Sequence, residues 1–431
     1  MDYRKIAAAV GLAAVAAVTR ADDVKAVSYK PGDGFSFQTT DDAFKLTLGG
    51  RLQAQYAYSG VDAQPERVGV SQDASSFKIK RAFVWFKGNA FTRDLSYKIQ
   101  ADFSASFPLL DAWMNYRLAD EFQLEAGQDI VPFSRQALNS SATYQFIERA
   151  TPVDYYIPLY DMGAMVNGKI AKGLAYYSVG IFNGQGVNQA RSTPNSAVNL
   201  RAVVNPLGDF SYAETDVDGT PNPLLSIGAS YFMNKVAYGT AADALTGSNY
   251  QKGFLKPLAG LPGVDSSGAT LAEDVAKVGM VEVDAAFKWM GLYAQGEYFL
   301  ASAEAAKTVN PVGYGGPLGD AGGKRKLKSS GYYVQAGYMV LPRTLELAVR
   351  YGAYDPNTTS WETPTDTSAQ HDQRTELSGG VNYYLYKHGF KLQATVSSLG
   401  REERSLAAGA APTAYRKLND LVGRVQAQVL F

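Results

Sequence analysis

The chain has 431 residues, with 41 basic and 41 acidic side chains, two histidines and no cysteine. The lack of cysteine excludes disulfides, thiolate metal sites and thiol nucleophiles, and the balanced charge argues against a basic face for nucleic acid. The 28 tyrosines and 42 glycines suit sheets and membrane interfaces, because tyrosine has an apolar body and a polar tip.

The N-terminus has the features of a secretory signal peptide. Two basic residues precede an Ala-rich apolar run over 6–18, which is too short to span a membrane as a helix. Small residues flank Arg20 and offer a cleavage site. We therefore expect a signal peptide over 1–21, a short periplasmic segment over 22–42 and one domain over 43–431. The alternative is a buried or anchoring N-terminal helix.

From Phe44 onward the dominant pattern has a period of two, which is the period of a β-strand. Apolar residues at 44, 46, 48, 52, 56 and 58 share one face, and polar residues at 45, 47, 51, 53 and 55 share the other. The same alternation recurs over 95–103, 332–340, 345–351, 390–396 and 421–431. Strands of this length can cross a membrane when tilted, with the apolar side toward lipid and the polar side toward water.

One strand candidate, over 77–88, departs from strict alternation. Arg81 and Lys87 fall on the same face as Ile79 and Phe83. A β-bulge or a shift of register would reconcile the pattern, and the sequence leaves both open.

The connections alternate between short and long. Short turns are expected near 290–291, 341–344 and 386–389, and long loops near 59–75, 131–159, 183–197, 235–276, 302–328, 355–374 and 401–418. This pattern is typical of outer-membrane barrels. One link at the short-turn end, near 207–222, is longer than usual. We predict an all-β fold, a transmembrane antiparallel β-barrel of about 16 strands in the bacterial outer membrane. The alternative is a secreted soluble all-β protein.

Several runs resemble the phosphate-selective porin O/P family in the expected order and over nearly the whole mature chain. These runs are KLTLGGRLQ (45–53), GQDIVPFS (127–134), FIERATP (146–152), YSVGIFNG (177–184), NPLG (205–208), GYYVQAGY (331–338) and GVNYY (380–384). A terminal Phe431 after an amphipathic strand is similar to the assembly signal of outer-membrane barrels.

The resemblance implies a sixteen-stranded barrel, usually a homotrimer, whose third extracellular loop is folded into the lumen. It also implies a preference for anions, through basic residues that line the pore. The loop entry of the family often reads Gly-x-x-Lys-x-Pro-Phe, and here Ile130 takes the place of the lysine. We therefore expect weaker phosphate selectivity than the family pattern implies.

The candidate constriction is the loop over 131–159, because Arg135, Glu148 and Arg149 bring both signs of charge into it. A loop folded into the lumen would narrow the pore and set its electric field. The alternative is an ordinary surface loop with solvated charges. Tyrosines at 144, 155 and 156 could line a track for sugars or pin the loop to the wall, and we favour pinning.

Basic residues on lumen-facing strand positions complete the candidate anion-binding set. Arg51, Lys98 and Arg117 belong to it, and Lys78 and Lys80 join them if their strand keeps a simple register. Lys169, Asp102 and Asp111 are also expected on lumen faces, and the two carboxylates would offset the cations. The alternative is that all these charges only solvate the pore wall.

Catalysis has little support in the sequence, and no cofactor or metal is expected. Acidic residues and His371 over 362–372 could bind a cation, but we favour a solvated loop. His388 is expected in a short turn and His371 in a loop, so neither sits beside a serine in a rigid strand. We expect a passive porin in outer-membrane lipid for small anions such as phosphate or small polar solutes. The alternatives are a weakly selective diffusion pore, an outer-membrane enzyme, and a structural or adhesin barrel with a plugged lumen.

Overall fold

The structure is a computed structural model. It describes residues 24–30, 32–62, 73–104, 109–191, 194–237, 249–255, 274–305, 326–356, 358, 373–404 and 415–431. The His371 and signal-peptide predictions lie outside the described residues. Within the described ranges, no helix has the length and hydropathy needed to cross a bilayer.

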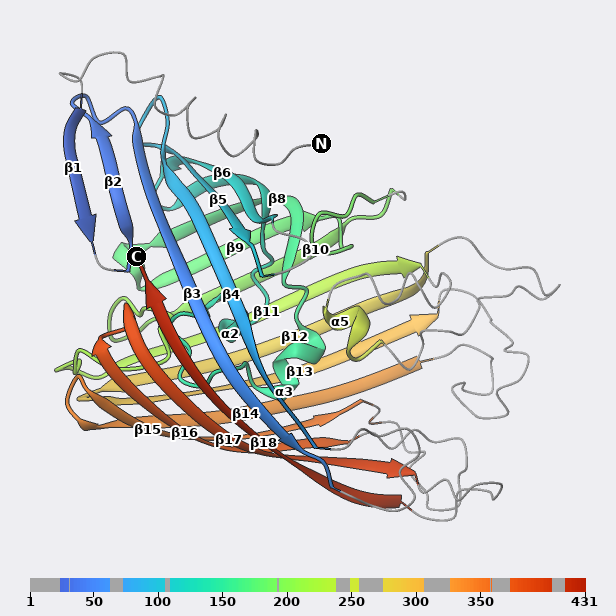
Figure 1. Ribbon diagram of the computed structural model, residues 1–431. Helices are drawn as coiled ribbons and strands as arrows, with labels where there is room; N and C mark the ends of the chain where they lie inside the picture. The colour runs from blue at the N-terminus through green and yellow to red at the C-terminus, as the bar shows by residue number, and fades with distance from the viewer. Residues whose placement is uncertain are drawn as a thin grey trace, which may run out of the picture.

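Sixteen antiparallel strands close into a barrel (Figure 1). They are β3 (Lys45–Gly60), β4 (Ala74–Asn89), β5 (Leu95–Asp102), β6 (Leu109–Ala119), β7 (Phe122–Ile130), β8 (Tyr160–Ile170), β9 (Ala175–Phe182), β10 (Ala197–Val204), β11 (Leu224–Ala237), β12 (Asp274–Trp289), β13 (Leu292–Ala305), β14 (Lys326–Leu341), β15 (Leu345–Asp355), β16 (Arg374–Tyr386), β17 (Phe390–Arg404) and β18 (Tyr415–Leu430). The prediction of an all-β barrel of about sixteen strands is confirmed.

The last strand closes the sheet on the first. β18 pairs with β3 in antiparallel register, from Leu421 opposite Gly60 to Leu430 opposite Arg51. Phe431 continues the ladder, because its N–H donates to the Gly50 carbonyl at 3.0 Å and its carbonyl accepts from the Gly50 N–H at 2.7 Å. Closure satisfies the backbone groups that a sheet edge would leave unpaired in hydrocarbon.

Side chains alternate between the two faces of the barrel wall as the sequence predicts. In β14, Tyr332 and Val334 are exposed on the outer face, whereas Tyr333 and Gln335 are buried on the inner face. The outer face is apolar and the inner face is mainly polar, which is the arrangement that a bilayer outside and water inside require.

A β-bulge accounts for the irregular pattern over 77–88. Gln53 of β3 pairs with Arg81 and Ala54 pairs with Ile79, so Lys80 is the extra residue. Before the bulge, Phe77 and Ile79 face outward. After it, Arg81 and Phe83 take the inner positions, opposite inward-facing Gln53 and Arg51. The bulge therefore keeps each half of β4 amphipathic.

Deleting Lys80 tests the bulge directly. Without Lys80, Ile79 and Arg81 become neighbours, as their partners Ala54 and Gln53 already are, so the ladder becomes regular and the other side chains of β4 keep their faces. We therefore expect this variant to fold. Deleting Ala82 instead turns either Arg81 or Lys87 to the outer face, because a one-residue slip moves side chains to the other face, and a basic side chain on the lipid face costs about 2–4 kcal/mol near the bilayer midplane. Lys80→Gln, which keeps the chain length, is the control. The measurement is heat-modifiable electrophoretic mobility; loss of folding on deletion of Lys80, or folding of the Ala82 deletion as well as the control, would contradict the assignment.

The segment over 22–42 contains an element that the sequence analysis missed. β1 (Val24–Lys30) and β2 (Gly34–Thr39) form a hairpin, and β2 pairs with the start of β3, where Phe35 lies opposite Leu48. β18 pairs with residues 51–60 of β3, and β2 pairs with residues 45–48 on the same edge, which β18 does not reach. The hairpin extends from the short-turn end of the barrel (Figure 1).

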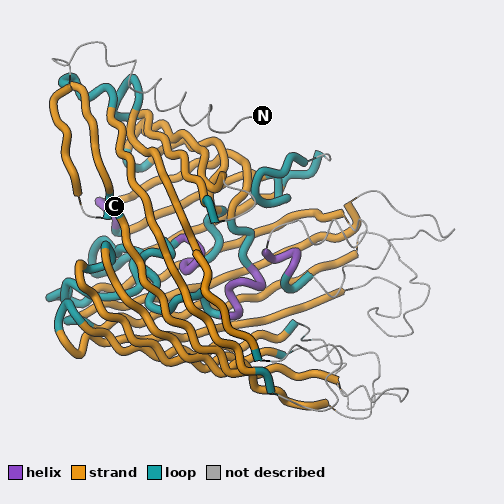
Figure 2. The backbone as a smooth tube through the Cα atoms, viewed as in Figure 1, coloured by secondary structure: helices purple, strands orange, loops and turns teal. Residues whose placement is uncertain are grey.

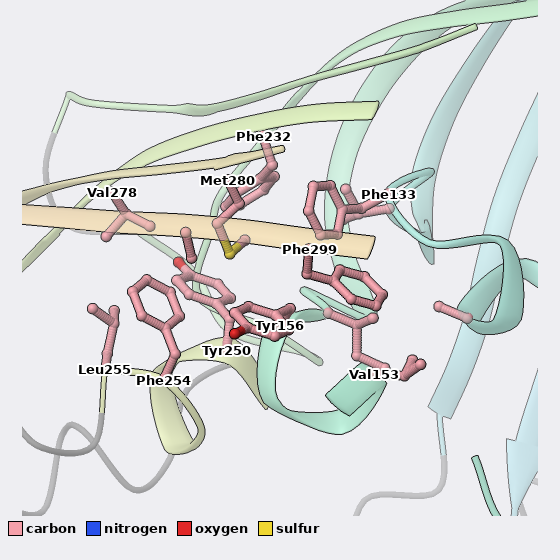
Figure 3. Packing of buried hydrophobic residues seen from close by; sticks show 14 of the residues in the cluster. Phe133, Val153, Tyr156, Phe232, Tyr250, Phe254, Leu255, Val278, Met280 and Phe299 are labelled. Carbon is pink, nitrogen blue, oxygen red and sulfur yellow. The ribbon is translucent and has the colours of Figure 1, made fainter. Parts of the chain in front are cut away.

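Short turns gather at one end of the barrel, and the strand ends that the long connections join lie at the other (Figure 2). Inside the barrel lie α2 (Arg135–Leu138) and α3 (Thr151–Tyr156), both in the β7–β8 loop, and α5 (Asn249–Lys252) in the β11–β12 connection. A buried apolar cluster fixes these pieces to the wall (Figure 3). In it, Tyr156 stacks on Phe299 of β13 with ring centres 5.1 Å apart.

Candidate pore constriction

The loop over 131–159, here called the constriction loop, lies along the inner face of the barrel from β11 round to β4. Its backbone and side chains bond to inward-facing groups of these strands. Near its middle, the Tyr144 carbonyl accepts from Lys391 Nζ at 3.0 Å, the Gln145 carbonyl accepts from Asn382 at 2.8 Å, and the Ala142 carbonyl accepts from Gln428 at 3.0 Å. Many weak attachments spread over several strands hold the loop against the wall.

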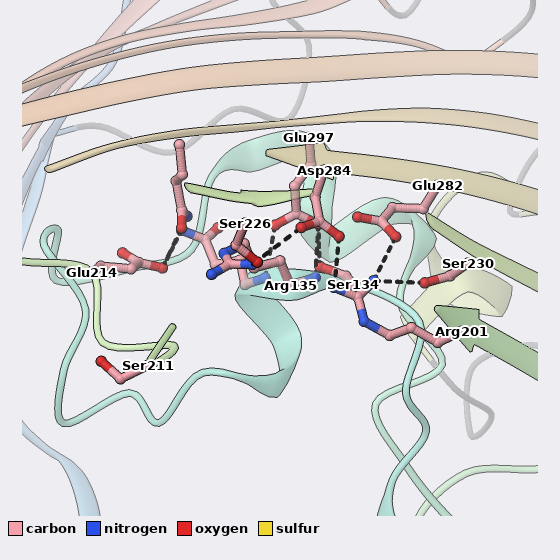
Figure 4. A network of polar contacts seen from close by, with 12 residues as sticks. Ser134, Arg135, Arg201, Ser211, Glu214, Ser226, Ser230, Glu282, Asp284 and Glu297 are labelled. Carbon is pink, nitrogen blue, oxygen red and sulfur yellow. Dashed lines mark hydrogen bonds and ion pairs between the residues drawn. The ribbon is translucent and has the colours of Figure 1, made fainter. Parts of the chain in front are cut away.

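The beginning of the loop is anchored by a network that excludes water (Figure 4). Arg135 Nη1 forms an ion pair with Asp284 of β12 at 3.2 Å, and its guanidinium lies 4.8 Å from the Phe210 ring centre. Ser134 Oγ and the Gln136 N–H donate to Glu297 of β13 at 2.6 and 2.7 Å. Arg135 is 1% exposed. We therefore interpret Arg135 as an anchor of the loop rather than a contact for permeating anions.

The end of the loop is anchored by a second buried ion pair. Arg350 of β15 pairs with Glu376 of β16 and donates to the Glu148 carbonyl at 3.0 Å. Glu376 also accepts from Thr151, through its backbone N–H and its hydroxyl, both at 2.8 Å. The start of α3 is therefore bound to the wall through one carboxylate.

Next to the second anchor, at Glu148, the loop faces a basic region on β4 and β18. Lys80 Nζ lies 2.6 Å from Glu148 Oε1, and Arg81 donates to Gln53 at 2.9 Å. Lys78 is exposed on the inner face, opposite Gln55, and Arg424 is half-buried at an inward position of β18. We call Lys78, Lys80, Arg81 and Arg424 the basic cluster.

Solvent access separates the basic cluster from the anchoring network. The side chains of Lys80 and Glu148 are 26% and 24% exposed, whereas those of Arg135 and Asp284 are 1% and 0% exposed. An ion crossing the barrel can meet only charges that water reaches. The basic cluster therefore fits a place on the solute path, and the anchoring network does not.

Two further predicted residues occupy this region in different ways. Arg51 is buried beneath the loop, where it donates to Ser140 Oγ at 3.1 Å and lies 4.3 Å from the Phe83 ring centre. Arg149 donates to Asp154 at 2.8 Å and to the Tyr144 hydroxyl at 3.2 Å. Both keep a positive charge close to the loop, so they contribute to the field even where they do not contact a solute.

Lys98 and Arg117 lie on the strands next to the basic cluster. Lys98 of β5 pairs with Asp111 of β6 at 2.9 Å, so its charge is offset on the wall. Arg117 lies at the short-turn end of β6 and is paired with Asp94 at 2.8 Å and Asp120 at 3.3 Å. Arg117 is therefore at the barrel rim, away from the constriction loop.

A cavity of about 290 Å³ lies on the side of the lumen formed by β7 to β10. Its lining includes Gln123, Asn167 and Arg201 from the wall and Pro132 and Leu138 from the constriction loop. The loop therefore leaves space beside it, rather than filling the whole cross-section at this point.

The tyrosines of the loop lie against protein. Tyr144 and Tyr156 are 2% and 0% exposed. Tyr155 stacks on Tyr354 of β15 with ring centres 3.9 Å apart. These contacts favour the interpretation that the tyrosines pin the loop over a track for sugars.

Glu148 remains ionised in this region. Burial would raise the pKa of its carboxyl group, but the cationic groups of Lys80 and Arg81 outweigh burial and hold the pKa at about 2. The carboxylate thus cancels part of the positive charge of the basic cluster at every pH above about 4.

Replacing Glu148 by glutamine tests that cancellation. We expect Glu148→Gln to raise the chloride-to-potassium permeability ratio, because Lys80 loses its counter-charge. The rise should be equal at pH 8 and pH 5, since the depressed pKa keeps the wild-type carboxylate charged at both. Reversal potentials in a KCl gradient measure the ratio. An unchanged ratio would show that Glu148 does not offset the basic cluster, and a rise confined to pH 8 would show that the pKa of Glu148 is not depressed.

Sequence reasoning left several groups out of the candidate site. Arg424 was expected on the water-lining face of its strand but not in the anion-binding set, the face of Arg81 was left open, and Glu214, in the link between β10 and β11, reaches Gln136 of the loop at 2.9 Å. The unusual length of the 207–222 link was the available signal for Glu214. The contacts between distant strands that place these groups carry no local pattern.

The comparisons with known proteins identify the family and agree with the barrel fold. The model of the phosphate-selective porin O and P family matches residues 44–429. Porin O of Pseudomonas aeruginosa is 24% identical over 371 residues, which cover 81% of this chain and 76% of that protein. Among solved structures, the anion-selective porin from Comamonas acidovorans has a TM-score of 0.54 at 10% identity and covers 90% of this chain and 99% of its own. The trimer form of OmpT from Vibrio cholerae has a TM-score of 0.51 at 11% identity, covering 90% and 100%.

Proposed function

This chain belongs to the phosphate-selective porin O and P family, a group of bacterial outer-membrane porins, and from that premise we propose that it is a passive pore with a preference for small anions such as phosphate. Solutes cross down their concentration gradient, and the protein performs no chemistry on them. The cations of the basic cluster attract anions into the narrow part of the lumen, where the low dielectric of the wall strengthens their field.

One observation carries the proposal. Four cations on β4 and β18, which are Lys78, Lys80, Arg81 and Arg424, face the lumen beside the constriction loop, with Glu148 as the acidic partner of Lys80. The net charge of this region is positive. Arginine suits phosphate, because its planar fork donates two hydrogen bonds to one anion.

The same geometry argues for moderate rather than tight phosphate selectivity. Ile130 at the loop entry packs against the buried apolar cluster and supplies no charge. Asp102 and Asp111 on neighbouring strands add acidic charge close by, and Asp111 is paired with Lys98. We therefore propose that phosphate binds weakly and that smaller anions also pass.

We also propose a homotrimer, with residues 1–21 as the export signal and the hairpin β1–β2 in the periplasm. The trimer form of OmpT, which shares the fold, supports the oligomeric state. The outer face of the barrel, with its exposed tyrosines, valines and leucines, suits outer-membrane lipid.

Planar-bilayer recording tests the proposal. In a KCl gradient, the reversal potential should show that chloride is more permeant than potassium, and phosphate added to the bath should reduce the chloride current at millimolar rather than micromolar concentration. A preference for potassium would overturn the anion function. A folded protein that never conducts would instead favour the plugged structural barrel.

A further inference from the structure

The connection between β10 and β11, over 205–223, starts and ends at the short-turn end of the barrel, but it does not form a short turn. Phe210 packs against Tyr293 and Ala286 on the inner wall. Val217 packs against Met339 and Tyr384, on β14 and β16. The segment, here called the strut, therefore reaches across the inside of the barrel from β10 toward β16.

The base of the strut is bound to the β12–β13 hairpin. Lys288 Nζ donates to the carbonyl of Ser211 at 3.1 Å and to its hydroxyl at 2.9 Å. On the other side, the Asp216 carboxylate accepts from the Gly291 N–H at 2.7 Å and from the Thr220 N–H at 2.9 Å. These two attachments hold the residues between them in a defined position beneath the constriction loop.

Glu214 stands between these attachments and is fully buried (Figure 4). From the constriction loop, Gln136 Nε2 donates to Oε1 at 2.9 Å and the Gln145 N–H donates to Oε2 at 3.1 Å. From the wall, Gln295 donates to Oε1 at 3.2 Å and Gln335 to Oε2 at 3.0 Å. The Glu214 N–H donates in turn to the Thr143 carbonyl at 3.0 Å.

The chemistry of this arrangement favours a positioning role. The four donors are amide N–H groups with fixed directions, and both carboxylate oxygens accept from the loop and from the wall at once. Hydrogen bonds to a charged acceptor are roughly twice as strong as neutral ones. One carboxylate therefore sets where the loop stands relative to the wall.

We propose that the strut, through Glu214, fixes the constriction loop from the short-turn side and thereby sets the width of the pore. This inference rests on the proposed function, since it assigns a cause to the width of the same constriction. Glu214 acts through the loop and does not contact a permeating solute. The constriction loop is therefore held from two sides. The barrel wall binds it at its two anchors, and Glu214 of the strut binds it at Gln136 and Gln145.

Single-channel recording of a residue exchange tests the proposal. Glu214→Gln keeps the size and shape of the side chain but replaces one carboxylate oxygen by an NH2 group. With this group at the Oε1 position, Gln136 and Gln295 lose the acceptor of their hydrogen bonds. Gln136→Glu places a second carboxylate against Glu214. Each single variant should raise the time spent in wider conductance levels by roughly tenfold, the expected effect of removing bonds to a buried charged group. The double variant should return toward the wild-type level, because the new amide of 214 can donate to the carboxylate of 136, and only the bond from Gln295 stays broken.

Two further variants keep the test decisive. Asp218→Asn changes a carboxylate of the same segment that is exposed and pairs with the exposed Lys387, so it should record as wild type. Gln295→Ala removes the longest of the four bonds to Glu214, together with the contacts of Gln295 to Tyr293 and Tyr333, and leaves the bonds from the loop in place, so it should give an intermediate effect. A purely structural role would lower the folded yield of both single variants without producing wider levels in the channels that do form.

Steady wild-type conductance in Glu214→Gln and Gln295→Ala would overturn the inference, and so would a double variant noisier than either single one. These outcomes are distinct from failure of the proposed function. That failure appears in the wild-type protein itself, as a preference for potassium or a lack of conductance.

Discussion

Replacing Lys78 and Arg81 together by glutamate should convert the pore from anion preference to cation preference. Both side chains face the lumen on β4, opposite Gln55 and Gln53, and both are accessible to solvent. Two unit charges 4 Å apart in water interact by about 1 kcal/mol, so reversing two charges beside the path should lower the chloride-to-potassium permeability ratio by roughly tenfold or more. Reversal potentials in a KCl gradient measure the change.

The matched control reverses two charges away from the path. Lys172 and Lys387 lie in turns at the short-turn end, and both are exposed. Their double replacement by glutamate should leave the ratio within about twofold of wild type, because charges beyond a Debye length of about 8 Å are largely screened. Equal effects of the two double variants would contradict the assignment of the basic cluster to the solute path.

The largest loss of stability is expected from Glu376→Ala. This change leaves the Arg350 guanidinium buried without its carboxylate and removes the acceptor of the two hydrogen bonds that Thr151 donates. Removing one partner of a buried ion pair costs about 3–5 kcal/mol. The midpoint of urea unfolding in lipid bilayers, followed by tryptophan fluorescence, should therefore shift to lower urea concentration.

The conductance of the same variant should also rise, because the start of α3 is released from the wall. The control is the double variant Arg350→Met with Glu376→Leu, which removes both charges and leaves a flexible side chain to pack on Phe146, now 4.3 Å from the guanidinium. We expect it to lose less stability than Glu376→Ala. If the double variant were the less stable, the ion pair would not be the source of the effect.

The barrel could be predicted because its signal is local. Alternation within each strand shows which side chains meet lipid, and the contrast of short and long connections gives the order of the strands. The outer face of Tyr332 and Val334 and the inner face of Gln335 could be assigned from their positions in the sequence alone. The hairpin β1–β2 escaped because its strands are short and lie outside the alternating region.

The constriction was harder to predict, because long-range contacts decide which charges meet water. Arg135 and Glu148 lie in the same loop and have similar sequence surroundings. Only the folded chain brings Asp284 of β12 to Arg135, which is then buried, and Lys80 of β4 to Glu148, which stays wet. The bulge at Lys80 also decides that Arg81 faces the lumen, and the sequence left that choice open.

The contacts of the strut were the hardest to predict from the sequence. The length of the 207–222 link marked it as unusual, but its sequence gives no sign that Glu214 bonds to Gln136 and Gln335. Those partners are separated from it by 78 and 121 residues along the chain. Closure of the barrel brings them together, so the contact follows from topology rather than from local pattern.

The central claim is that water and solutes pass beside the basic cluster and not through the anchoring network. The chain has no cysteine, so one can be introduced at each place and labelled selectively. A charged thiol reagent should change the single-channel current of Arg81→Cys within seconds. It should leave Ser226→Cys, at a buried position that contacts Arg135, unmodified. An inert Arg81→Cys, or equally fast modification of Ser226→Cys, would contradict the account.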